Sequence, residues 1–338
     1  MPKIVIDPTI TRQEAEGFAY PLGVYPVEPL KPAPGFTVEF ESADGDNESD
    51  WEEWPDRFMF DVVVTSQRLR SLCKLLFSFL PGRVYPILDV LGNDAYREID
   101  PYISYELVSI ERFLDGVIQF EDWLFEDGLV GFGAMSMNPF LYVFVDEHKA
   151  VTIRVGLDLK DRVERSLAAF DLTQVQELVS VDSVAHEHRT VLLPPTETEA
   201  VDSLAPEDII ERLVESWLLQ LNVDPRTNVD DSGRDLGFTA WRMVARCLPE
   251  ENSDPVYAEV IAVADCLENA EAVAVRAVAE APDAPGRPGN GWLEVHLPVC
   301  DRVTPEGAAK ALDRPGEVAL TGEEILRVRW FEPQRQPE

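Results

Sequence analysis

The sequence predicts an α+β protein of two domains, each a mostly antiparallel sheet with one or two packed helices. Its 338 residues are 45% hydrophobic, which is ample for a real core and, by length, suggests two domains or one large one. Short alternating apolar runs, typical of half-buried strands, outnumber the segments with helical spacing. A polar segment with three prolines, 194–206, divides the chain and indicates a linker.

Residues 1–35 form a proline-rich N-terminal arm. Proline removes a backbone donor and fixes φ, so we expect the arm to run as extended chain rather than pair in the centre of a sheet. The first α+β domain is expected over 36–193 and the second over 207–332.

The clearest helix of the first domain is expected over 67–80, where leucines recur at spacings of three and four before Pro81-Gly82. A longer helix is expected over 104–125, and a partly amphipathic one over 161–179. Glu147-His148-Lys149 is expected to be the turn between two strands. Apolar and alternating runs predict the strands of this domain at 36–41, 58–65, 83–90, 129–137, 140–146, 150–155 and 184–193.

The second domain is expected to open with a strong helix, because Pro206 and two acids precede a wide apolar stripe that ends at Leu221. Three segments then predict a strand meander: 238–248, 256–265 and 272–280. A helical pair is the alternative for the last two, which are rich in alanine. A strand at 292–299, a short helix at 305–312 and a strand at 323–332 complete the domain.

Charge is the extreme feature of the composition, since 63 acids against 29 Lys and Arg give a net charge of −34. Such a field repels nucleic acid phosphates and anionic membranes and attracts basic partners. We therefore expect no direct nucleic-acid binding and no membrane association. The first residues lack a secretory pattern, and the 4 cysteines form no Cys-x-x-Cys pair, so we expect reduced thiols and a cytoplasmic location.

The densest acidic run, 39–56, holds nine acids and no base. It lacks the glycine and the glutamate that a calcium loop of the EF-hand type requires. Two tryptophans beside these acids suggest an anchor in a field that steers a basic partner, or rings that fold back to pin the loop. The candidate partner-binding residues are Asp46, Glu48, Asp50, Trp51, Glu52, Glu53 and Trp54.

His186 and His188 are two of only 4 histidines in the chain. On a strand, residues two apart point to one face, so both imidazoles can reach one divalent metal ion. His296, in another alternating strand, is the expected third ligand. The alternative is a pair of exposed histidines on the polar face of a strand. The glutamate of His-x-His metal barrels is missing downstream, and the His-Glu-x-x-His spacing is absent.

No motif for a nucleotide or an organic cofactor is present, and no catalytic residue can be chosen among so many acids. The function that the sequence predicts is therefore non-enzymatic. We expect a soluble protein that acts by contact with another protein, its acidic surface suited to a basic partner, as an inhibitor or immunity-type protein does. The alternatives are a metal-dependent enzyme built on His186 and His188, and a mimic of nucleic acid.

Overall fold

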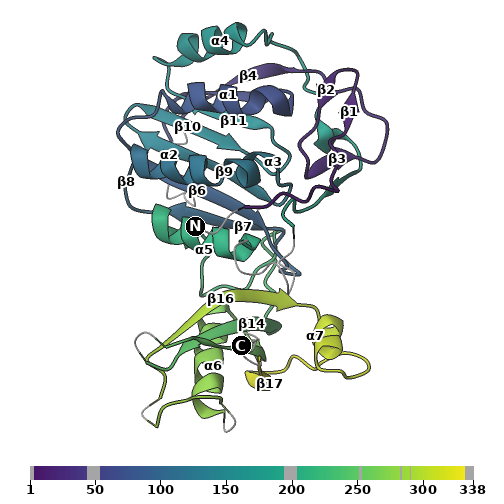
Figure 1. Cartoon of the computed structure of the whole chain (residues 1–338), viewed down its shortest axis with the longest axis vertical. Coiled ribbons are helices and arrows are strands. Elements are labelled where there is room, and N and C mark those ends of the chain that lie inside the picture. Colours follow the sequence, from purple (N-terminus) through teal and green to yellow (C-terminus); the bar gives the residue numbers. More distant parts are fainter. Residues whose placement is uncertain are drawn as a thin grey trace. The chain divides into compact units, whose positions relative to one another are not determined.

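A computed structural model describes residues 4–43, 54–193, 204–250, 253–281, 284–289 and 291–331. It confirms the α+β class (Figure 1). The chain forms two compact units, one of Met1–Leu91 with Asp100–Asn222 and the other of Gly92–Ile99 with Val223–Glu338. The division thus falls after Asn222 and not in the expected linker 194–206. The reason is that α5 (Pro206–Trp217) buries its apolar stripe in the first unit, where the Trp217 ring centroid lies 5.1 Å from that of Phe113.

The first unit is built on a large antiparallel sheet with the strand order β13-β7-β6-β9-β10-β11-β5-β4, and β8 pairs with β6 at its side. Alternate residues are buried in β6 and β11, whereas β9 and β10 are buried along most of their length, and the strands enclose one core with the helices. The strands expected at 36–41, 58–65 and 83–90 are all present. Within the described residues, the nine strands of this sheet are β4 (Gly35–Glu41), β5 (Arg57–Val63), β6 (Arg83–Leu91), β7 (Ile99–Ser104), β8 (Val108–Ser109), β9 (Val130–Met137), β10 (Phe140–Val145), β11 (Val151–Val155) and β13 (Leu219–Leu221).

The helices of this unit match the sequence in part. The helix expected over 67–80 is α1 (Ser66–Phe77). The single helix expected over 104–125 is wrong: its first residues are strand, and it then divides into α2 (Ile110–Gln119) and α3 (Glu121–Glu126). Ser109 accepts a hydrogen bond from the backbone of Arg112 and so starts α2, and the backbone leaves helical geometry at Phe120. The helix expected over 161–179 ends early, as α4 (Lys160–Ala169).

The N-terminal arm contributes three short strands, β1 (Glu14–Ala15), β2 (Phe18–Ala19) and β3 (Val24–Pro26). The strand expected over 184–193 is only three residues long, β12 (His186–His188), and it follows a 3₁₀ turn at Val181–Ser183. β3 and β12 pair with each other in a small sheet separate from the large one. The arm therefore stays outside the large sheet, as its prolines predict.

The second unit is a four-stranded antiparallel sheet with the order β16-β14-β15-β17. Its elements are β14 (Thr239–Leu248), β15 (Val256–Ala264), α6 (Leu267–Glu280), β16 (Glu294–Val303), α7 (Pro305–Ala311) and β17 (Glu324–Trp330). The meander expected over 238–280 is wrong in its third segment, which is α6. Ala270, Ala274 and Ala277 are buried one turn apart, and alanine is the strongest helix former. Small side chains there let α6 pack directly on the sheet.

In the part of the chain that the structure describes, no helix is long and apolar enough to cross a membrane.

Candidate metal centre

Three histidines meet in the first unit: His148, His186 and His188. Their ring centroids lie 4.8, 4.8 and 4.9 Å apart, and each pair of rings is inclined by 70–73°. One ring nitrogen from each lies within 4.8 Å of the others. The ring centroids thus form a near-equilateral triangle, with a nitrogen of each ring close to those of the other two.

β12 supplies two of the three rings. His186 and His188 share one face of the strand, as their spacing predicts, and both are half-buried. Glu187 points to the opposite side, where it accepts a hydrogen bond from the hydroxyl of Tyr25. That contact joins β12 to β3, because Glu187 pairs with Tyr25 in the small sheet. The face of β12 that carries Glu187 therefore holds the strand to β3. The opposite face, which carries His186 and His188, contacts the third ring.

The tight turn between β10 and β11 supplies His148, whose side chain is 18% exposed. The backbone of Lys149 donates to the carbonyl of Asp146 at 3.1 Å, and Lys149 adopts a φ of +67°. The Asp146 carboxylate also accepts from the Ala150 backbone at 2.8 Å. These contacts close the turn and fix the direction in which His148 leaves it.

Each imidazole has an oxygen acceptor at its Nδ1 atom. Nδ1 lies 2.7 Å from the carbonyl of Val184 in His186, and 2.6 Å from the carbonyl of Gly128 in His188. In His148, Nδ1 lies 3.3 Å from a Glu147 carboxylate oxygen. A carbonyl or carboxylate oxygen only accepts, so each Nδ1 is assigned the proton. In the neutral rings the unshared electron pair is then on Nε2, the atom that binds a metal when Nδ1–H is held by an outer oxygen.

The Nε2 atoms of His148 and His186 lie 3.0 Å apart. With both Nδ1 positions protonated, this contact places two lone pairs against each other unless a cation lies between them. Burial opposes the charged form of His148, but hydrogen bonding to Asp146 and the nearby carboxylates outweigh it and raise its pKa. Burial lowers the pKa of His188, and the two neighbouring histidines act in the same direction. Without a metal, a proton on His148 relieves the contact; a metal ion replaces that proton.

Two glycines let the backbone of β12 approach the large sheet closely enough for His188 to reach Gly128. A Cβ atom on Gly128 would lie 2.1 Å from the Gly23 carbonyl oxygen, and one on Gly23 would lie 2.2 Å from the Gly128 nitrogen. Through this contact the Gly128 backbone donates to Arg189 at 3.1 Å, and the Arg189 backbone donates to Gly23 at 2.9 Å. At Gly128 this close backbone packing therefore positions a histidine.

Gly128→Ala is therefore expected to destabilise the protein by about 1–3 kcal/mol, since the added methyl group has no room between two backbones. It should also weaken metal binding, because the Nδ1 acceptor of His188 moves with residue 128. Urea unfolding and a metal titration measure the two effects. Gly82→Ala is the matched control, because a Cβ atom there meets nothing within 4 Å. Unfolding and metal binding as in the wild type would contradict the packing argument.

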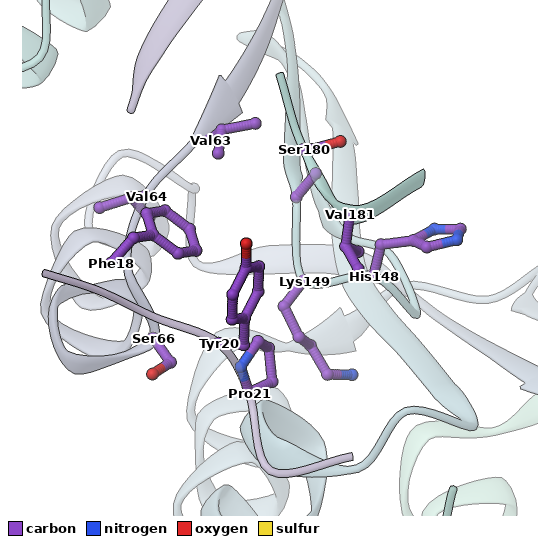
Figure 2. Close-up of a pocket in the computed structure, with 11 residues that line it drawn as sticks. Phe18, Tyr20, Pro21, Val63, Val64, Ser66, His148, Lys149, Ser180 and Val181 are labelled. Carbon is purple, nitrogen blue, oxygen red and sulfur yellow. The ribbon is translucent and has the colours of Figure 1, made fainter. Parts of the chain in front are cut away.

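Beside the histidines lies a small cavity of about 20 Å³, lined in part by Tyr20, Val63 and Lys149. In Figure 2 the imidazole of His148 points away from this cavity, so the cavity is not the space between the three rings. Lys149 is buried with its amine donating to the Val130 carbonyl, and burial lowers its pKa to about 8. The cavity has room for about one water molecule, and no more than that.

The third ligand expected from the sequence, His296, is exposed in β16 of the second unit, opposite Arg246. His148 occupies the corresponding role in the group of three. The sequence places His148 correctly in a turn, but the distance of 38 residues to His186 hides the contact. The only signal was its place at the end of a hairpin, where a side chain can reach past the sheet.

Of the candidate partner-binding residues, Asp46, Glu48, Asp50, Trp51, Glu52 and Glu53 lie outside the described residues. Trp54 is described, and it folds back on the sheet. Its ring centroid lies 5.5 Å from that of Phe140, and the guanidinium groups of Arg57 and Arg154 each lie 5.2 Å from its ring. The sequence left two alternatives for the tryptophans, an anchor for a partner and rings that fold back on the domain. Trp54 shows the second of these.

Comparisons of the chain with protein-family models, with curated proteins and with solved structures give no match.

Proposed function

We propose that the first unit binds a divalent transition metal ion of the zinc class through Nε2 of His148, His186 and His188. The observation that carries the proposal is the orientation of the three rings. Each has an oxygen near Nδ1, one ring nitrogen from each lies within 4.8 Å of the others, and the Nε2 atoms of His148 and His186 lie 3.0 Å apart. The lone pairs of neutral imidazoles repel one another at short distance. A single cation bound between them replaces this repulsion with metal–nitrogen bonds.

The ligand set favours zinc or a neighbouring metal. Imidazole suits zinc, copper, iron and nickel, whereas calcium and magnesium prefer oxygen. For zinc–nitrogen bonds of about 2.0–2.1 Å in a tetrahedral site, the nitrogen atoms stand roughly 3.3 Å apart. The His148–His186 separation of 3.0 Å is close to this value. The group contains no fourth side chain from the described residues, which leaves one coordination position for water or another ligand.

A metal ion with three histidine ligands and one open position can act as a Lewis acid and lower the pKa of a bound water. This chain supplies the outer contacts that such a site needs, from the carbonyls of Val184 and Gly128 and the carboxylate of Glu147. These contacts hold the imidazoles in one tautomer and one orientation. The contact with a basic protein partner stays a prediction, because residues 44–53, which hold six of the nine acids of the run 39–56, lie outside the described residues.

Metal content is the direct test. Metal-free protein titrated with Zn²⁺ or Co²⁺ is expected to bind one equivalent, and Co²⁺ should give the visible absorption of a four-coordinate site. His148→Ala, His186→Ala and His188→Ala should each weaken binding by at least about 100-fold, because a site reduced to two ligands holds the ion poorly. Calorimetry and absorption measure both.

His296→Ala is the matched control, since it removes the remaining histidine of the chain and should leave binding unchanged. Equal loss in His296→Ala would contradict the assignment of His148 as the third ligand. A wild-type protein that takes up no stoichiometric metal would overturn the proposal.

A further inference from the structure

Carboxylates border the proposed metal centre on the side of His148. Glu147 Oε1 lies 3.3 Å and Asp146 Oδ2 lies 3.8 Å from the Nδ1 atom of His148. The two carboxylate side chains are 15% and 34% exposed, so both stand near the surface. Among the described residues, neither lies at ion-pair distance from a lysine or an arginine. Their negative charge is therefore left to act on the centre.

A third carboxylate, that of Asp182, belongs to the 3₁₀ turn that precedes β12. Val181 of this turn lines the same small cavity as His148, and Figure 2 shows the two side chains beside each other. Asp182 is exposed and accepts a hydrogen bond from the hydroxyl of Ser180. Burial opposes the charged form of His148, but Asp182 is among the neighbouring carboxylates that outweigh it and raise its pKa. The turn thus brings a negative charge to the histidine centre.

Lys149 and Arg189 stand next to the ligands in the sequence, but they do not balance these carboxylates. Lys149 is buried, and the nearby carboxylate of Asp127 offsets its charge. The guanidinium of Arg189 lies 4.6 Å from the ring of Tyr25, whose hydroxyl holds Glu187 on the opposite face of β12. In the described part of the chain, carboxylates are therefore in excess beside the three histidines.

We infer that the fourth coordination position takes a neutral nitrogen donor, such as an imidazole or an amine, in preference to an anion. The inference rests on the proposed function, since it concerns the open position of that metal centre. With neutral imidazole ligands a divalent ion keeps both of its positive charges, and the carboxylates of Asp146, Glu147 and Asp182 together exceed them. An anion in the fourth position adds to this excess, whereas a neutral donor does not.

The charge of a ligand, more than its donor atom, then decides what binds. Metals of the zinc class accept nitrogen as well as oxygen ligands. A substrate activated at this centre would bind through a neutral atom, as amines and imidazoles do, rather than through a phosphate or a carboxylate. The net charge of −34 acts in the same direction. Since charges beyond about 8 Å are largely screened at physiological salt, the carboxylates beside the centre have the larger effect.

The test uses the full chain loaded with Co²⁺, whose visible absorption changes when the fourth ligand changes. Imidazole and azide both bind metals through nitrogen but differ by one charge, so the pair separates the effect of charge from that of the donor atom. The titrations are made at constant ionic strength and at about pH 8, where imidazole is neutral. Imidazole should bind at least about 10-fold more tightly than azide.

Asp182→Asn should raise the affinity for azide relative to that for imidazole about fivefold, because one negative charge beside the centre is lost. Asparagine keeps an oxygen that accepts the hydrogen bond from Ser180, so the turn should be retained. Asp115→Asn is the matched control, since Asp115 is also exposed but lies on α2, which packs against α5 and β6. It should leave the ratio of the two affinities as in the wild type.

The outcomes separate this inference from the proposed function. Co²⁺-loaded protein that binds azide as tightly as imidazole would overturn the inference and leave the metal centre intact. So would a spectrum that imidazole does not change, or a ratio that Asp182→Asn leaves unaltered or that Asp115→Asn raises equally. Protein that takes up no Co²⁺ would overturn the proposed function, and the inference with it.

Discussion

Asp94→Ala is expected to lower the free energy of unfolding by about 3–5 kcal/mol, because it leaves Arg302 buried without its counter-charge. The Asp94 side chain is fully buried and that of Arg302 is 4% exposed, with 2.9 Å between Asp94 Oδ2 and Arg302 Nε. Asp94 also accepts from the backbone of Arg302 at 2.8 Å and from that of Tyr96 at 2.9 Å. The pair holds the segment Gly92–Ile99 to β16 of the second unit.

The remaining contacts of Arg302 do not replace the carboxylate. Arg302 Nη1 donates to Asn228 Oδ1 at 3.1 Å and to the Val229 carbonyl at 2.7 Å, and both acceptors are neutral. The double variant Asp94→Ala/Arg302→Met should therefore recover part of the lost stability, since it removes the stranded charge and fills its volume. Glu323→Ala breaks an exposed ion pair to Arg276 and should cost no more than about 1 kcal/mol.

Urea unfolding followed by tryptophan fluorescence measures all three variants. Trp241, whose ring centroid lies 5.9 Å from the Arg302 guanidinium, reports on the region directly. If Asp94→Ala were no more destabilising than Glu323→Ala, the buried pair would have no special role in holding this segment.

Local signals in the sequence sufficed for much of the fold. Alternating apolar residues predict β4, β5 and β14, and leucine spacing with Pro81-Gly82 predicts α1, because side-chain periodicity directly reflects burial on one face. The sequence did not distinguish the strand β15 from the helix α6. Both segments alternate alanine and valine, and an alanine-rich run fits the buried side of either element. Packing against the sheet decides it, and packing is not local.

The candidate metal centre shows the same limit. That His186 and His188 share a face follows from the two-residue period of a strand. The sequence favoured His296 as the third ligand because it lies in another alternating strand, whereas His148 was placed in a turn, and nothing local shows which of the two lies near His186. The order of strands in the large sheet brings the β10–β11 turn to β12, and Gly23 and Gly128 allow the final close approach. Those are contacts between distant segments, which composition and spacing do not specify.

Zinc binding is expected to stabilise the protein strongly, because the three ligands come from segments far apart in the chain, which the ion joins in the folded state only. His148 belongs to a turn of the large sheet, whereas His186 and His188 belong to a small sheet that contains part of the N-terminal arm. An ion that binds only the folded state at 100 times its dissociation constant adds about 2.7 kcal/mol. For a unit of this size that corresponds to a rise in Tm of about 5–10 °C.

The residues that zinc protects from hydrogen exchange show whether the ion bridges the two sheets or binds elsewhere on the protein. Hydrogen exchange in the presence of zinc should slow most in 180–193 and in the paired residues Val24–Pro26, and chelation should reverse it. His188→Ala should abolish both the rise in Tm and the local protection, because it removes a ligand from β12. His296→Ala should keep both. Protection spread evenly over the chain, or retained in His188→Ala, would mean that zinc binds elsewhere.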